Sequence, residues 1–207
     1  MKNVIQHLKV SACAIMMAFG MAACNGSSDT TVTSDSTATM SSDNMDTNAS
    51  MNMSSDAMKE HAMAQLSGTN ADTTVSGSAQ FDAANGKVKM ELELTIPKMA
   101  NKSVAVHIHE MADCGDMGKA AGGHWNPTNA QHGKWGTGSF HSGDIGNVTL
   151  DGSGKGTMSL ETDLWSLGGD AKTNILNRTV MVHSGTDDFT SQPSGNAGSR
   201  IGCGVIQ

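Results

Sequence analysis

Residues 87–96, KVKMELELTI, alternate polar and apolar side chains. Successive side chains on a strand point to opposite faces, so this alternation predicts a strand with one face in a core. The flanking runs TTVSGSAQF and SVAVHIHE alternate likewise, beyond the turn-forming segments DAANG and PKMANK. Further strands are expected at NVTL, GTMSLE, NRTVMVH and RIGCGVI. Helical periodicity is absent, so we predict an all-β fold, a Greek-key β-barrel or sandwich of about eight antiparallel strands.

Two long segments of this β region carry no strand pattern, residues 111–144 and residues 184–199. Structureless stretches of this length inside a compact domain are usually either functional or disordered. The first of them contains several histidines, which favours a functional role. We therefore predict two long functional loops.

The histidines are concentrated in one part of the chain. Two of the eight fall near the N-terminus, and the other six are His107, His109, His124, His132, His141 and His183. In the strand VAVHIHE, the H-x-H spacing places two imidazoles on one face, where they can chelate a metal or form a polar pair on an edge strand. Six histidines with Asp144 close by favour the metal. They exceed the needs of one tetrahedral site, which predicts two neighbouring sites.

The first 23 residues are predicted to be a signal peptide. Lys2 and Lys9 precede an apolar run that is too short to span a bilayer comfortably. The run ends in GMAAC, which resembles the lipobox of bacterial lipoproteins, so cleavage would leave Cys24 as the lipidated first residue. The alternative is ordinary secretory cleavage near residues 22–23 with a free Cys24. We expect an exported protein of the bacterial cell envelope, periplasmic and anchored to a membrane by lipid.

Four cysteines are present, and two of them remain after this processing. Cys13 leaves with the signal peptide and Cys24 takes the lipid, so Cys114 and Cys203 are left. A pair of cysteines in an exported chain predicts one disulfide, which would tie the 111–144 loop to the C-terminal strand. The alternative is two unpaired buried thiols, which fits an oxidising compartment badly.

Residues 24–66 are rich in Ser, Thr, Asp and Asn and low in branched apolar residues. This composition predicts a disordered tether, with the folded domain at residues 67–207. Removing residues 1–23 takes away two of the 13 basic residues and none of the 20 acidic ones, which leaves a formal net charge of −9. This charge excludes a generic nucleic-acid binder.

The tether is also rich in methionine for a segment that has no core to fill. Its methionines are Met40, Met45, Met51, Met53, Met58 and Met63, and His61 lies among them. Thioethers are soft ligands suited to Cu(I), so one hypothesis is that the tether captures copper. The alternatives are compositional drift in a linker and a reversible sink for oxidants.

Taken together, five motifs resemble the copper/zinc superoxide dismutase family in order and spacing. They are HIHE, AGGHWNP, HGKWGTGSFHSGDIGN, VMVHSGTDD and GNAGSRIGCGVIQ. The resemblance covers roughly residues 62–207. It implies an enzyme that dismutates superoxide to O2 and H2O2 and thereby protects the cell envelope from oxidative damage.

The resemblance also assigns the ligands by position. It makes the copper ligands His107, His109, His124 and His183, and the zinc ligands His124, His132, His141 and Asp144. His124 would then bridge the two metals. Asp187 resembles the carboxylate that connects a copper ligand to a zinc ligand, here His107 to His132, and its alternative role is a plain loop turn.

The resemblance implies a role for Arg200 beside copper, where its permanent charge docks the superoxide anion. The resemblance further implies that copper would alternate between Cu(II) and Cu(I), that His124 would carry a proton, and that zinc would hold the other side of the bridge without redox chemistry. The loop 184–199 contains no lysine to guide substrate, and Lys119 and Lys134 could substitute for one. The alternative functions are a non-catalytic copper carrier and a copper-only dismutase. A carrier would not need Arg200, and a copper-only enzyme would not need the zinc ligands, but this sequence contains both.

Overall fold

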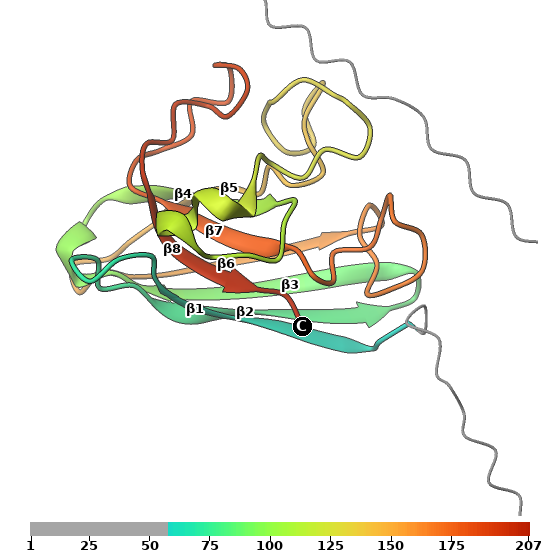
Figure 1. Cartoon of the computed structure of the whole chain (residues 1–207), viewed down its shortest axis with the longest axis horizontal. Coiled ribbons are helices and arrows are strands. Elements are labelled where there is room, and N and C mark those ends of the chain that lie inside the picture. The colour runs from blue at the N-terminus through green and yellow to red at the C-terminus, as the bar shows by residue number, and fades with distance from the viewer. Residues whose placement is uncertain (1–57) are drawn as a thin grey trace, which may run out of the picture. The chain divides into compact units, whose positions relative to one another are not determined.

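The computed structural model describes residues 58–207, so the predicted signal peptide, Cys24 and most of the predicted tether lie outside the described residues. Eight strands form one antiparallel sheet in the order β5-β4-β7-β8-β1-β2-β3-β6 (Figure 1). The strands are β1 His61–Gly68, β2 Ser76–Ala84, β3 Lys87–Thr95, β4 Ser103–His109, β5 Gly146–Thr149, β6 Lys155–Thr162, β7 Thr179–His183 and β8 Arg200–Val205. The edge strands β5 and β6 are in contact, so the sheet is a nearly closed barrel. The predicted all-β fold is confirmed.

Two short 3-10 helices interrupt the connections, η1 Pro97–Met99 and η2 Asp116–Ala121. Neither they nor any other helix within residues 58–207 has the length and apolar character needed to cross a bilayer. The other connections are turns and loops. The chain therefore folds by strand pairing and by the packing of side chains inside the barrel.

Alternation of side chains along the strands fills the barrel interior. In β3 every second residue is buried and the residues between them are exposed. The buried members pack with Phe81 and Trp165 in the main core and are Val88, Met90, Leu92 and Leu94. Burying a large apolar side chain contributes roughly 1.5–3 kcal/mol, so this inward face is the main source of the barrel's stability.

Strand β4 differs from β3 because both of its faces are buried. Val104, Val106 and Ile108 belong to the main core. The alternate residues Ala105, His107 and His109 point out of the barrel and are nevertheless buried. Something must therefore cover the outer face of this part of the wall.

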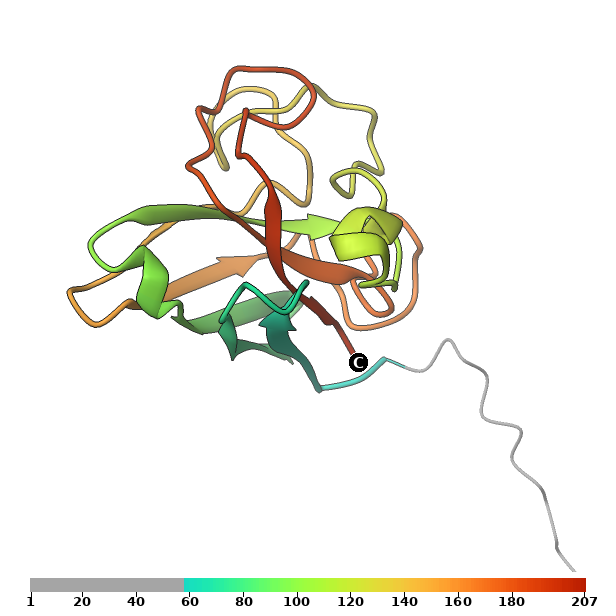
Figure 2. The ribbon, with the colours of Figure 1, turned by 60° about the vertical axis from the view of Figure 1, so that its left-hand side comes forward.

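The cover is formed by the two long loops, which connect β4 to β5 and β7 to β8. Figure 2 shows them rising together on one side of the barrel, although they lie far apart in the sequence. Their positions match the predicted functional loops at residues 111–144 and 184–199. The outer face of β4 and β7 thus becomes the floor of an enclosed polar region.

The prediction that residues 24–66 are entirely tether is wrong at its C-terminal end. Strand β1 begins at His61 and pairs with β2 along its length, so the folded domain starts before residue 67. The sequence HAMAQL does alternate, but its inward residues are Ala62, Ala64 and Leu66. Alanine is a weak hydrophobic signal, and the strand becomes evident only when the rest of the barrel buries these side chains.

Candidate metal centre

The six candidate histidine ligands lie between the barrel wall and the two loops. His107 and His109 come from the outer face of β4, and His183 ends β7. The pairing of β7 with β8 shifts register between Val182 and His183, and such irregularities re-aim a side chain. His124 belongs to the first loop, but its backbone pairs with that of His109. Segments distant in sequence are thus joined by backbone pairing around one point.

The structure brings together the four residues predicted to bind copper. Their candidate ligand atoms all lie within 4.8 Å of one another, and the residues are His107, His109, His124 and His183. No thiolate or carboxylate belongs to this group. Imidazole nitrogens are good ligands for Cu(II), so the donor set fits copper.

Backbone carbonyl groups fix the orientation of two of these rings. His109 Nδ1–H donates to the carbonyl oxygen of Gly122 at 3.0 Å, and His183 Nδ1–H donates to that of Gly198 at 3.4 Å. A neutral imidazole carries one proton, so donation from Nδ1 leaves the lone pair on Nε2. In both residues Nε2 is the nitrogen available to a metal.

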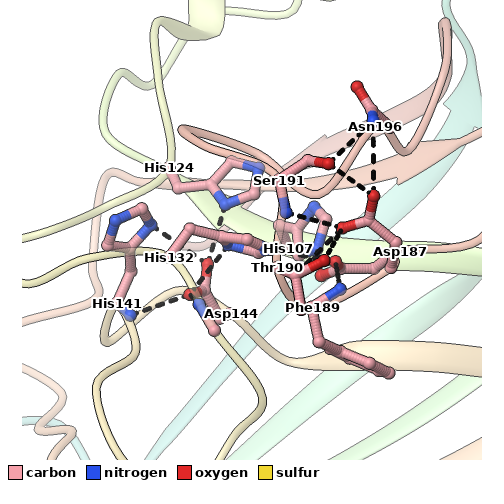
Figure 3. A network of polar contacts seen from close by, with 12 residues as sticks. His107, His124, His132, His141, Asp144, Asp187, Phe189, Thr190, Ser191 and Asn196 are labelled. Atoms are coloured by element: carbon pink, nitrogen blue, oxygen red, sulfur yellow. Dashed lines mark hydrogen bonds and ion pairs between the residues drawn. The ribbon is translucent and has the colours of Figure 1, made fainter.

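The four residues predicted to bind zinc also converge. Asp144 Oδ1 lies 2.8 Å from His124 Nδ1 and 3.1 Å from His141 Nδ1, and Asp144 Oδ2 lies 3.0 Å from His132 Nδ1 (Figure 3). The backbone N–H groups of Gly133 and His141 donate to Asp144 Oδ2 at 3.1 and 2.8 Å and hold the carboxylate in place. Three imidazole nitrogens and one carboxylate are a donor set typical of a closed zinc site.

His124 belongs to both groups and faces each with a different nitrogen. Its Nδ1 is directed at Asp144 on the zinc side, whereas its Nε2 is buried without a partner. Its ring centroid lies 4.0 Å from that of His107 and 5.6 Å from that of His141. A single imidazole in this position can therefore serve two neighbouring metals.

Asp187 links the two groups from the opposite side. Its Oδ2 lies 2.8 Å from His107 Nε2 and its Oδ1 lies 2.9 Å from His132 Nε2, so the predicted contact is present (Figure 3). Both histidines are thereby left with Nδ1 for a metal. Gly195 makes the arrangement possible, because a Cβ atom there would lie only 1.8 Å from Asp187 Oδ1.

The buried ring nitrogens test whether metals fit this site. Within residues 58–207, six buried side-chain nitrogen atoms have no hydrogen-bond partner, and they are His107 Nδ1, His109 Nε2, His124 Nε2, His132 Nδ1, His141 Nδ1 and His183 Nε2. An unsatisfied buried polar atom costs roughly 1–3 kcal/mol, and native proteins contain few of them. All six belong to the two ligand groups, so the site fits metal cations, which would supply the missing partners.

The electrostatics of the site favour metal binding at neutral pH. Burial lowers the pKa of His109 to about 2, that of His183 to about 3 and that of His124 to about 4, so these rings are neutral. Burial opposes ionisation of Asp144, but hydrogen bonds from the His124 ring and from the backbone N–H groups of His141 and Gly133 outweigh it and hold its pKa well below the usual range. The protonation states that metals require are therefore already present in His109, His124, His183 and Asp144.

A cleft of about 760 Å³ leads from the surface to the copper group and is lined by His109, His124, His183 and Arg200. The guanidinium of Arg200 donates from Nη1 to the Gly118 carbonyl at 2.6 Å and from Nη2 to the Gly122 carbonyl at 2.7 Å. The same Gly122 oxygen accepts from His109. Arg200 is thus a fixed positive charge beside the copper group, where a small anion can dock.

The predicted disulfide between Cys114 and Cys203 is confirmed, and the alternative of two unpaired thiols is wrong. It joins the first loop to β8, three residues after Arg200. The bridge packs against Ala121 and Met181 outside the barrel. It therefore holds the wall of the cleft that carries the Gly118 and Gly122 carbonyl groups.

Sequence reasoning missed one residue that braces the site. The side chain of Gln192 accepts from the backbone N–H of His132 at 2.9 Å and donates to the backbone carbonyl of His132 at 2.9 Å. This two-bond clamp joins the second loop to a zinc-group residue 60 positions earlier. No local pattern in the sequence distinguishes Gln192 from an ordinary polar loop residue.

The fold is an all-β barrel, and two adjoining groups of metal-ligating side chains lie beside one cleft. This combination defines a class of protein with two metal sites, a four-histidine site suited to redox chemistry and a closed site suited to zinc. The profile of the family described as copper/zinc superoxide dismutase (SODC) matches residues 75–206. The chain belongs to the copper/zinc superoxide dismutase family. Copper and zinc are the metals of that family, in agreement with the two donor sets.

Relatives come from distant organisms. The extracellular copper-zinc superoxide dismutase of Caenorhabditis elegans is 36% identical over 140 residues, which cover 65% of this chain and 62% of that protein. Copper-zinc superoxide dismutase 2 of Aquifex aeolicus is 33% identical over 158 residues, which cover 74% of this chain and 89% of that protein. The crystal structure of the clock protein EA4 has a TM-score of 0.64 and 30% identity and covers 72% of this chain and 95% of its own.

Proposed function

We propose that this chain dismutates superoxide to O2 and H2O2 at a copper site that His124 bridges to a zinc site. The observation that carries the proposal is the position of His124, whose two ring nitrogens face separate ligand groups. Arg200 and His124 line the same cleft. The cleft therefore combines an anion-docking group with a proton-carrying ring at a metal.

The chemistry of the donor atoms assigns one group of ligands to copper and the other to zinc. Copper would be held by His107, His109, His124 and His183, and zinc by His124, His132, His141 and Asp144. Bound copper would supply a one-electron couple between Cu(II) and Cu(I), and zinc would keep a constant charge. Asp187 orients His107 and His132 from behind, which fixes the nitrogen that each offers.

The residues around the metals perform the remaining tasks. Arg200 attracts superoxide and orients it in the cleft through N–H groups that its bonds to Gly118 and Gly122 leave free. His124 takes up a proton at Nε2 and donates it to the reduced dioxygen species, and water supplies the second proton. The balance is two superoxide anions and two protons for one O2 and one H2O2. Lys119 lines a depression beside Arg200 and is suited to attracting substrate.

The experiment that tests the proposal is metal analysis of the purified mature protein combined with a superoxide-consumption assay. We expect one copper and one zinc per chain and rapid loss of superoxide. Copper binding without zinc would support a copper-only dismutase. Binding of both metals without superoxide consumption would support a copper carrier, and either result contradicts the proposal.

We propose in addition that the protein is an exported lipoprotein of the bacterial envelope, periplasmic and held by lipid on Cys24. The N-terminal motif supports this, as does the disulfide, because disulfides persist in oxidising compartments. Replacing Cys24 with Ser should move the protein from the membrane fraction to the soluble fraction without changing its specific activity. The comparison is fractionation of wild-type and variant cells, and a wild-type protein found only in the soluble fraction would contradict lipidation.

We propose further that the methionine-rich tether captures Cu(I) and delivers it to the copper site. Because β1 starts at His61, a deletion that tests this must end before the strand, and residues 40–57 are suitable. The deletion should leave activity unchanged when copper is abundant and lower copper occupancy when copper is scarce. Equal copper loading of the full-length and deleted proteins in competition with a Cu(I) chelator would contradict the proposal. It would favour the alternatives, compositional drift in a linker or a reversible sink for oxidants.

A further inference from the structure

His61 and Met63 were expected in a disordered tether, but both lie on β1 with fixed neighbours. They occupy the outward face of the strand, whereas Ala62 and Ala64 point inward and belong to the core. The His61 side chain is 76% exposed and Met63 is 48% exposed. A thioether and an imidazole therefore stand side by side on the surface of a folded sheet.

A carboxylate orients the His61 ring. Asp82 is the direct cross-strand partner of His61 on β2, and its Oδ1 lies 2.5 Å from His61 Nδ1. Donation from Nδ1 to the carboxylate leaves the lone pair of the neutral ring on Nε2. The same principle operates in the metal centre, where Asp187 holds one nitrogen of His107 and leaves the other for a metal.

The spacing of His61 and Met63 allows both to contact one ion. Residues two apart on a strand share a face, with Cα atoms about 6.6–6.8 Å apart. The pair His107 and His109 has this spacing on β4, and its candidate ligand atoms lie within 4.8 Å of each other. His61, Met63 and Asp82 also line one surface depression, together with Gln80 and Gln207.

Met58, the next methionine toward the N-terminus, does not belong to this group. It lines a different depression with Trp165, and its sulfur atom lies close to Gly169. The motif MKEHAM is therefore divided by the fold. Only its HAM part presents a nitrogen and a sulfur donor on one face.

We propose that His61 Nε2 and Met63 Sδ form a second copper site, a surface site for Cu(I) separate from the buried metal centre. A soft thioether with an imidazole favours Cu(I) over zinc or calcium. The exposure of both side chains makes the site open and exchangeable, in contrast to the buried ligands. The inference deepens the proposed copper capture by giving it a fixed point on the domain, and it does not depend on dismutase activity.

The test uses the full mature protein with copper and zinc already bound in the metal centre and copper kept reduced. Cu(I) is added in competition with a chromophoric Cu(I) chelator, while NMR follows the labelled methionine methyl groups. We expect an additional equivalent of Cu(I) to shift the Met63 methyl signal. His61→Gln and Met63→Leu should each abolish this equivalent without changing superoxide consumption.

Two control variants distinguish copper binding at the β1 site from copper binding by methionines elsewhere in the chain. Met111→Leu removes a methionine of similar exposure, 55%, from another segment and should retain the additional equivalent. Leucine at Met40, Met45, Met51 and Met53 removes tether sulfur atoms and should leave the Met63 shift intact. An unmoved Met63 signal, undiminished binding by His61→Gln, or loss of the shift in the tether variant would each overturn the proposal.

Discussion

Replacing Arg200 with alanine is expected to slow superoxide consumption by about ten- to a hundredfold while copper and zinc remain bound. A change of this size corresponds to roughly 1.4–2.7 kcal/mol, the scale of one charged docking group. Arg200 donates hydrogen bonds to two backbone carbonyl groups and belongs to neither ligand group, so ligation does not require it. The measurements are kcat/KM for superoxide and metal content.

Arg200→Lys is the matched control for this prediction. Lysine keeps the charge but cannot donate through a planar fork to the carbonyl groups of both Gly118 and Gly122. Its rate should fall between those of wild type and Arg200→Ala if charge and orientation both matter. An unchanged rate in Arg200→Ala, or loss of copper from that variant, would show that the assigned role is wrong.

Replacing Asp144 with alanine is expected to empty the zinc site first and to leave copper in a looser environment. The carboxylate is fully buried and is the only acidic member of the zinc group. Its loss also leaves the backbone N–H groups of Gly133 and His141 without their acceptor, which loosens the 111–144 loop. We expect zinc to be lost on dialysis against a chelator, faster hydrogen exchange in the loop and activity that depends more steeply on pH.

Asp144→Asn separates the charge from the hydrogen bonds. Asparagine retains an oxygen acceptor of similar size, so the loop should stay ordered while zinc affinity still falls. Metal analysis and hydrogen exchange on both variants provide the comparison. Stoichiometric zinc in Asp144→Ala after dialysis would contradict the ligand assignment.

The sequence by itself determined seven of the eight strands and the identity of the donor groups. Strand alternation is a local property with a period of two, so β3 and β4 can be identified without knowing their partners. The histidines, Asp144 and Arg200 were identifiable because their residue types and order carry the chemistry. The weak alternation of Ala62 and Ala64 was insufficient, and the domain boundary was therefore predicted too late.

Only the tertiary structure decided which nitrogen of each ring is available to a metal. That choice depends on acceptors remote in sequence, such as Gly198 for His183 and Asp187 for His107. It likewise placed Gln192 against the backbone of His132. These contacts form when the two long loops close over the barrel wall, and no local pattern encodes them. Residue types therefore fix which donors are present, whereas the fold fixes their orientation, because hydrogen bonds across the closed loops select one state of each ring.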